Sequence, residues 1–194
     1  MVEIPKAGKV LSQKIYQSLN ILSAKLDNGI LYHQREMDYK KDQVLVKVTL
    51  KGGSIEETAA TKGLSNFAVI PLSMHSTKKL NSANINFLKT GKKYSLRASY
   101  DNDMFSLTLS SAPEDLEEGM QLLHLILTEA KIEKPVFELF KQQMKQQIKQ
   151  IKTSTQAQLS IASQDLMSGN DLRLQTPSLE EIDNIKIEAA QNYL

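Results

Sequence analysis

Four stretches in the middle of the chain alternate apolar and polar side chains, which is the pattern of strands that bury one face. Residues 44–50 come first, and residues 83–87, 94–100 and 105–109 follow. Turn-forming residues at positions 89–92 and 101–103 separate the last three stretches and predict hairpin connections between them. A sheet of such strands has one polar face and one apolar face, so it is predicted to be covered on one side only.

A further hairpin is predicted near the N-terminus. Asp27-Asn28-Gly29 lies between two apolar runs, residues 20–25 and 30–36. Asn-Gly in this position is a strong hairpin signal, because both central residues of the tightest turn need a positive φ. Residues 1–19 carry an early proline and glycine and little periodicity. They are predicted to form a linker or N-terminal extension, with a short helix over residues 11–19.

The second half of the chain has apolar residues at helical spacing. Helices are predicted to begin at Pro113 and near Pro135, because proline suits the first turn of a helix. A third helix is predicted over residues 155–167. Ser178 and Glu181 have the spacing of a capping box, which predicts a last helix ending at residue 193.

One more helix is predicted between the strands, over residues 55–75. Gly63 makes it irregular, and Pro71 removes a backbone N–H and is expected to kink it. Strands therefore come first and helices last, with one helix inserted. This order predicts an α+β fold in which a mostly antiparallel sheet has helices layered on one face, within a single domain over residues 20–194.

Composition excludes several function classes. The chain has 194 residues, which suits one domain with a sizeable core, and no cysteine, which removes thiol nucleophiles, disulfides and thiolate metal sites. The net charge is +2 and arginine occurs three times, so a nucleic-acid partner is not expected. No run is long and apolar enough to predict a membrane span, and residues 1–6 do not resemble a signal peptide.

Three local features are weighed as functional sites. The run over residues 141–152 repeats lysine at helical spacing and is interpreted as a solvated helix face, with a polyanion site as the alternative. His33, His75 and His124 are far apart, and none has a second ligand at a zinc-site spacing. No G-x-S-x-G elbow or phosphate-binding glycine loop occurs.

Five motifs follow one another along the chain. They are Leu26-Asp27-Asn28-Gly29-Ile30, the strand ending Lys51-Gly52-Gly53-Ser54 after Met37-Asp38-Tyr39-Lys40-Lys41-Asp42, Gly63-Leu64-Ser65-Asn66-Phe67, Ala112-Pro113-Glu114-Asp115-Leu116-Glu117, and Pro177-Ser178-Leu179-Glu180-Glu181-Ile182. Taken in order, they resemble the repeated domain of the insulinase/pitrilysin (inverzincin) zinc peptidases over residues 20–194. The resemblance implies the insulinase/mitochondrial-processing-peptidase-like fold. Within this family, the chain is most similar to the third domain of a four-domain protein.

The resemblance also implies where zinc ligands would lie. Active domains of the family carry H-x-x-E-H on the first helix and a further glutamate on a later long helix. The matching positions here are Asn66, Val69, Ile70 and Gln147. Two alkyl groups and two neutral amides replace the ligands and the general base, so no catalytic, metal or cofactor residue is expected in this chain. Zinc is expected instead in the catalytic domain of a longer parent peptidase.

The expected function is therefore that of a non-catalytic domain of an insulinase-type metallopeptidase. It would wall the substrate chamber, and its partners would be the catalytic half of the parent and the peptide substrate. A bacterial periplasm or envelope setting is suggested by the resemblance alone. Two alternatives stay open: a stand-alone protein-interaction module on the same fold, and an enzyme with a site that the sequence does not reveal.

Overall fold

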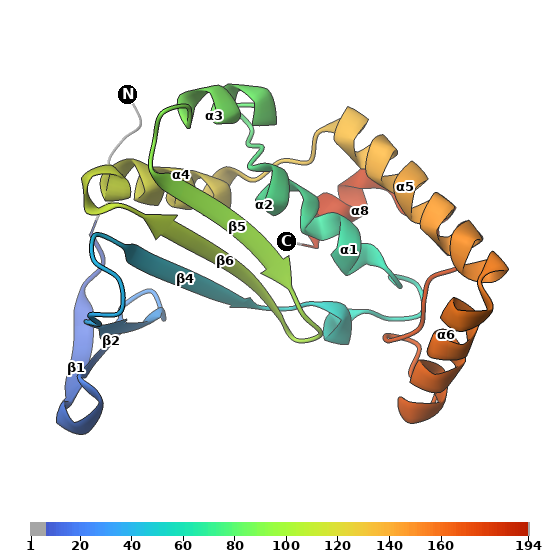
Figure 1. The fold of residues 1–194 in the computed structure, drawn as a ribbon, viewed down its shortest axis with the longest axis horizontal. Helices are drawn as coiled ribbons and strands as arrows, with labels where there is room; N and C mark the ends of the chain where they lie inside the picture. The colour runs from blue at the N-terminus through green and yellow to red at the C-terminus, as the bar shows by residue number, and fades with distance from the viewer. Residues whose placement is uncertain (1–6, 194) are drawn as a thin grey trace. The chain divides into compact units, whose positions relative to one another are not determined.

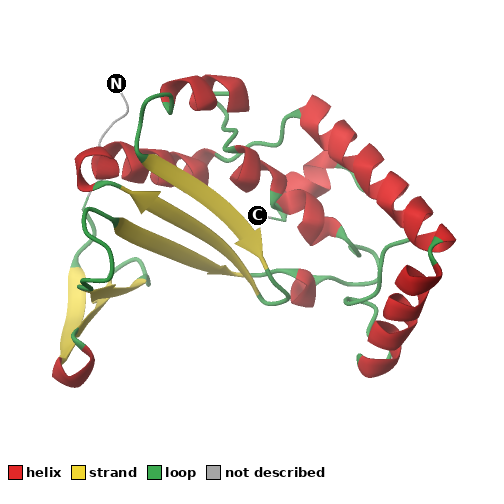
Figure 2. Cartoon of the chain, viewed as in Figure 1, coloured by secondary structure: helices red, strands yellow, loops and turns green. Residues whose placement is uncertain are grey.

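The computed structural model describes residues 7–193 (Figures 1 and 2). It divides into two compact units, Met1–Asp42 and Gln43–Leu194. The division differs from the predicted boundary after residue 19, because residues 10–16 belong to the same small sheet as the predicted hairpin. How residues 20–194 act within a longer protein stays a prediction.

The first unit is a three-stranded antiparallel sheet in the order β1-β2-β3. Its elements are β1 Val10–Tyr16, the 3-10 turn η1 Gln17–Leu19, β2 Ile21–Leu26 and β3 Leu31–Arg35. The strand β1 takes the place of the linker and of most of the short helix that the sequence predicted there, so that prediction is wrong for residues 10–16, whereas residues 17–19 form a 3-10 turn. The signal was weak because the valine, leucine and isoleucine of β1 do not alternate regularly and a bulge interrupts its pairing.

The predicted hairpin between β2 and β3 is confirmed, but its turn differs in type. Only Gly29 has a positive φ, at 86°. The N–H of Gly29 donates to the carbonyl of Leu26 at 3.1 Å, and the N–H of Leu26 donates to the carbonyl of Ile30 at 2.9 Å. This is a three-residue connection with glycine at the left-handed position, rather than a turn with two such residues.

The second unit contains a three-stranded antiparallel sheet in the order β4-β6-β5 (Figure 1). Its strands are β4 Val44–Lys51, β5 Tyr94–Tyr100 and β6 Met104–Ser111, which confirms three of the four predicted strands. Leu107 and Leu109 of the central strand β6 are fully covered, and β5 turns Leu96 to the same side. The connection between β5 and β6 is the predicted hairpin, closed by the N–H of Asp101 on the carbonyl of Met104 at 2.8 Å.

The fourth predicted strand, over residues 83–87, is instead the helix α3, Ser82–Leu88. The side chain of Asn81 accepts a hydrogen bond from the N–H of Asn84 and caps the helix at its start. Of the residues in α3, Ile85 is buried and Phe87 is 79% exposed. The apolar residues at three alternating positions therefore gave the pattern of a strand within a helix. Residues 89–92 connect this helix to β5 and do not close a hairpin.

The helix predicted over residues 55–75 is shorter and divided. It consists of the 3-10 turn η2 Ser54–Glu56, an irregular stretch, and the helices α1 Leu64–Ala68 and α2 Ile70–Met74. The two helices meet at Val69, and Pro71 lies at the start of α2. The interruption that Pro71 predicts is therefore confirmed, because a proline at this position has no N–H to continue the hydrogen bonds of α1.

The remaining helices are α4 Leu116–Glu129, preceded by the 3-10 turn η3 Pro113–Asp115, then α5 Lys134–Thr153, α6 Thr155–Met167, α7 Leu179–Asn184 and α8 Ile187–Asn192. The predicted third helix has the bounds of α6. The predicted last helix is divided into α7 and α8, although its capping box is present. Among the described residues, no helix is long and apolar enough to cross a membrane.

Two large apolar clusters contribute most of the core of the second unit. One joins Leu96, Leu107 and Leu109 of the sheet to Leu123 and Ile126 of α4, so α4 covers one face of the sheet. The other joins α1 and α2 to α5, α7 and α8, and its members are Leu64, Phe67, Ile70, Ile132, Phe137, Ile148, Ile182, Ile185 and Ala190. The fold is α+β with an antiparallel sheet, as predicted.

The side chain of Gln191 ties α8 to the connection between α4 and α5. Its Oε1 accepts from the N–H of Ile132 at 2.7 Å, and its Nε2 donates to the carbonyl of Ala130 at 2.9 Å. Replacing Gln191 with alanine leaves both backbone groups without this partner. We expect the free energy of unfolding to fall by about 1–2 kcal/mol, measured by urea denaturation. Asn192→Ala, on the exposed side of α8, is the control, and an equal loss in both variants would contradict the assignment.

Candidate functional site

The positions that match the family's zinc motif lie on α1 and at its junction with α2, and a glycine at the end of β4 sets their approach. Gly53 has φ 100° and ψ −167°, a conformation open to glycine alone. The N–H of Gly52 donates to Asp103, and the N–H of Ile55 donates to Asn102 at 2.8 Å. These bonds fix the chain leaving β4 against the β5–β6 hairpin before it reaches α1.

The carboxylate of Glu57 anchors the start of α1. Its Oε2 accepts from the N–H of Gly63 at 2.7 Å, and its Oε1 accepts from the N–H and the Oγ of Ser65. The side chain is 5% exposed, and it binds backbone donors that the first turn of a helix leaves unsatisfied. A carboxylate from outside the helix thus takes the place of an N-cap residue.

Asn66 stands at the position of the family's first zinc ligand, and its side chain is hydrogen-bonded to the sheet. Its Oδ1 accepts from the hydroxyl of Tyr100 on β5, and its Nδ2 donates to the carbonyl of Gly63 at 3.3 Å. Partial burial raises the pKa of Tyr100, with a smaller contribution from the charge of Glu57. The amide of Asn66 is therefore held by two protein partners.

The other ligand-matching residues on these helices belong to the core. Val69 is 8% exposed and packs with Ala68 and with Phe105 of the sheet, whereas Ile70 is 4% exposed and packs in the cluster of α5 and α7. Alkyl side chains have no lone pair to give a metal. Gln147, on α5, is exposed and precedes the buried Ile148.

Aromatic side chains bring α1 and α5 together. Phe67 lies with its ring centroid 5.2 Å from those of both Phe137 and Phe140, and the pair with Phe140 is edge to face. The donor set at the ligand-matching positions does not fit zinc. Over residues 7–193, no group of three or more histidine, cysteine, aspartate or glutamate side chains is placed to hold a metal ion. That the chain binds no zinc stays a prediction.

A polar pocket of about 280 Å³ opens beside Asn66 and Tyr100. Hydroxyl and amide groups dominate its lining, which also includes Glu57 and Arg173. Arg173 binds Asp171 at 2.6 Å, and its hydrogen bond lowers the pKa of that carboxyl to about 2. Sequence reasoning did not find Glu57 or Tyr100, because their partners lie 6 to 34 positions away and no local motif connects them.

Two of the four lysines in the 141–152 run have structural roles. The Nζ of Lys141 donates to the carbonyls of Asp183 and Ile185 at 2.7 and 3.0 Å, where α7 ends. Lys145 forms an ion pair with Asp183 at 2.6 Å. The interpretation of the whole run as a solvated face is therefore wrong for Lys141 and Lys145, which hold α7 on α5.

Because the ring of His75 is buried, we expect the free energy of unfolding to fall in mild acid. Burial, with the charge of Lys89, lowers its pKa from 6.5 to about 4, and a backbone hydrogen bond with Leu96 offsets part of this. Because the unfolded chain binds the proton near pH 6.5 and the folded chain only near pH 4, stability is complete above pH 6.5 and declines between these values. We expect a loss of about 3 kcal/mol across this range, measured by urea denaturation.

The matched variants are His75→Asn, which tolerates the left-handed backbone at φ 58°, and His124→Asn on an exposed face of α4. The first should flatten the pH dependence and the second should leave it unchanged. Equal pH dependence in wild type and His75→Asn would assign the effect to other groups.

A family model described as Insulinase (Peptidase family M16) matches residues 34–176. A comparison with curated proteins gave no match. Among solved structures, the ferredoxin protease FusC, in complex with Arabidopsis ferredoxin, has a TM-score of 0.84 at 16% identity, covering 98% of this chain and 21% of that one.

Two further structures are similar. The periplasmic protease PqqL from Escherichia coli has a TM-score of 0.84 at 16% identity, covering 100% of this chain and 21% of that one. An inactive domain of an M16 peptidase from Pseudomonas fluorescens has a TM-score of 0.76 at 15% identity, covering 90% of this chain and 43% of that one. At these identities the likeness shows the fold alone. The chain spans 21% of the length of FusC and of PqqL.

Proposed function

This chain belongs to the insulinase family, peptidase family M16, and from that premise we propose that it is a non-catalytic domain of a longer zinc-dependent peptidase. In this proposal the domain walls the substrate chamber and docks on the catalytic half of its parent. Its place is that of the third of four domains, and the peptide substrate is its second partner.

The burial of Val69 and Ile70 carries the proposal. Residues at these positions on the first helix would need to offer a base and a ligand to a metal in an active domain, and here both serve the apolar core. The similarity of the fold to an inactive M16 domain supports the same conclusion. The share of FusC and PqqL that the chain spans supports a longer parent.

Zinc retention by the isolated chain tests the non-catalytic part of the proposal. After dialysis against excess zinc and a metal-free wash, we expect less than about a tenth of an equivalent to remain, because the described residues, 7–193, offer no preformed donor set to hold it. The measurement is elemental analysis of the washed protein. One tightly held equivalent would contradict the proposal and return attention to the three histidines.

Complementation of the parent tests the docking part. A parent protein lacking this segment should lose cleavage of an unfolded peptide, and adding the separately expressed chain should restore cleavage that a chelator abolishes. Cleavage by the chain alone would indicate an enzyme in its own right. A parent that cleaves fully without the segment would favour the stand-alone interaction module.

A further inference from the structure

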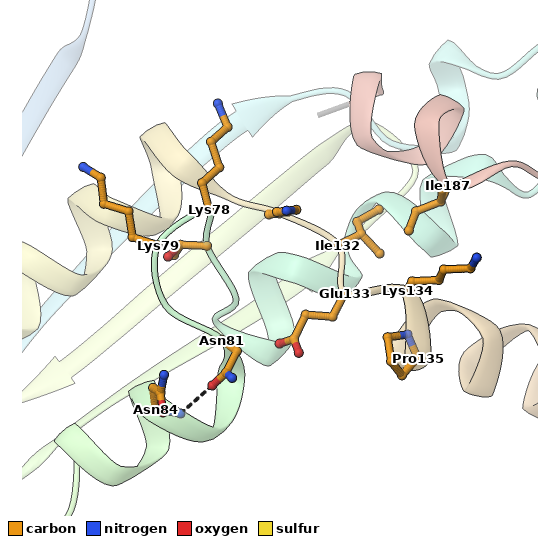
Figure 3. Close-up of a pocket in the computed structure, with 11 residues that line it drawn as sticks. Lys78, Lys79, Asn81, Asn84, Ile132, Glu133, Lys134, Pro135 and Ile187 are labelled. Atoms are coloured by element: carbon orange, nitrogen blue, oxygen red, sulfur yellow. Dashed lines mark hydrogen bonds between the residues drawn. The ribbon is translucent and has the colours of Figure 1, made fainter.

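A second pocket, larger than the one beside Asn66, lies away from Asn66, Val69 and Ile70. It has a volume of about 550 Å³ and opens where residues 77–81, before α3, meet residues 131–135, which lead into α5 (Figure 3). Ile187 of α8 completes its lining. None of the residues that match the zinc motif contributes to it.

Backbone hydrogen bonds fix the two segments that form the pocket. Thr77 and Ala130 form an antiparallel bridge, flanked by the N–H of Lys78 on the carbonyl of Glu129 at 2.9 Å. The N–H of Lys131 donates to the carbonyl of Ser76 at 3.0 Å, and the Oγ of Ser76 returns a bond to the carbonyl of Lys131 at 2.7 Å. The pocket is thus formed before any ligand binds, which reduces the entropic cost of binding.

Positive charge surrounds this pocket. Four lysines line it, at positions 78, 79, 131 and 134, and Figure 3 shows Lys78 and Lys79 on one side with Lys134 on the other. Lys79 is paired with Glu129 at 3.0 Å. Within the described part of the chain, the other three ammonium groups have no carboxylate within 4.0 Å.

The single carboxylate of the lining does not neutralise these lysines. Glu133 directs its side chain toward the start of α3, where its Oε1 accepts from the N–H of Ser82 at 2.9 Å (Figure 3). Asn81 caps the same helix through the N–H of Asn84. The acidic group therefore has a structural partner, and an excess of positive charge faces the solvent.

The chemistry of the lining suits a flexible anionic chain with apolar side chains. Lysine is a mobile point charge that pairs with an anion at many angles, and no arginine lines the pocket to hold an oxyanion in a fixed bidentate geometry. Pro135 and Ile187 add apolar surface among the lysines. A ligand that matches both properties alternates acidic and small apolar side chains.

We propose that this pocket binds an extended acidic segment of a polypeptide, with its carboxylates on Lys78, Lys131 and Lys134. The site would select a substrate or partner by charge, at a place separate from the positions of the lost zinc ligands. The inference goes beyond the proposed function and needs no catalytic partner for its test. Failure of the test would therefore leave the complementation experiment unaffected.

Calorimetric titration of the whole chain tests the inference. The probe is a peptide of about twelve residues in which glutamate alternates with alanine and leucine, compared with the same peptide carrying glutamine for glutamate. We expect the acidic peptide to bind about tenfold more tightly at low salt, and its advantage to shrink as salt screens the exposed charges. Equal binding of the two peptides would overturn the inference.

The decisive variant replaces Lys78, Lys131 and Lys134 with glutamine, and should weaken binding of the acidic peptide by about tenfold. Its control replaces three exposed lysines of the same unit, Lys47→Gln, Lys149→Gln and Lys152→Gln, which changes the net charge equally. If the two triple variants weakened binding equally, the effect would come from the overall charge of the protein, and the inference would be overturned.

Two further measurements complete the test. Lysine-to-arginine changes at the same three positions preserve the charge and should retain binding, which guards against a glutamine variant that fails to fold. Pyrophosphate and double-stranded DNA serve as competitors. Tighter binding of either one than of the acidic peptide would assign the pocket to phosphates and overturn the proposal.

Discussion

Alanine at position 53 is expected to destabilise the second unit by about 4 kcal/mol or more. A Cβ on Gly53 would overlap the carbonyl oxygen of Asp101 and lie 2.8 Å from that of Asn102. Both obstacles are backbone atoms of the β5–β6 hairpin, so no side-chain rotation relieves the clash. The backbone conformation at φ 100° adds strain of its own.

Urea denaturation monitored by circular dichroism measures the effect, and Gly91→Ala is the matched control. Gly91 also has a positive φ, at 80°, but a Cβ there would meet nothing within 4 Å. Its replacement should cost only about 1 kcal/mol, the penalty of the left-handed backbone. A Gly53→Ala variant as stable as Gly91→Ala would mean that the hairpin moves aside freely.

Removing the carboxylate of Glu57 should have the second largest effect. Glu57→Ala leaves three donors on Gly63 and Ser65 without their partner, in a region where Ser65 is fully buried. Hydrogen bonds to a charged group contribute more than neutral ones, and buried donors left unpaired add their desolvation cost. We expect a loss of about 3–4 kcal/mol in the free energy of unfolding.

The adjacent and exposed Glu56 supplies the control, and Glu56→Ala should change stability by less than about 0.5 kcal/mol. Glu57→Gln should lie between the two, because the amide can still accept through one oxygen only. Hydrogen exchange of the N–H groups of Gly63 and Ser65 offers a local measurement. Unchanged protection of these groups in Glu57→Ala would show that the carboxylate does not anchor α1.

Much of the second unit follows from the pattern of its residues. The strands β4, β5 and β6 alternate over seven or eight residues, which no helix can imitate, and α6 has a serine cap and a glycine stop at its ends. Short elements are less certain. The alternation over residues 83–87 is too brief to decide between strand and helix, and tertiary packing of Ile85 selects α3.

The candidate site was predictable only in part. The positions of Asn66, Val69 and Ile70 follow from alignment with the zinc motif of the family. Pro71 predicts the break between α1 and α2 that the structure contains. The contacts of Glu57 and Tyr100 depend on how β4, α1 and β5 meet in three dimensions. The lysines of the larger pocket come from two segments about fifty positions apart, and the bridge between Thr77 and Ala130, with the hydrogen bonds beside it, brings them together.

The attachment of α8 has a consequence for the order of events during synthesis. Tyr193 donates to the carbonyl of Gly53, 140 positions earlier, at 2.7 Å, and Ala190 fills the cluster around Phe67 and Phe137. During synthesis, α8 leaves the ribosome only after all the residues that α8 contacts in the folded unit. Until then Phe67 and its neighbours lack their cover, and the nascent chain exposes apolar surface that a chaperone could bind.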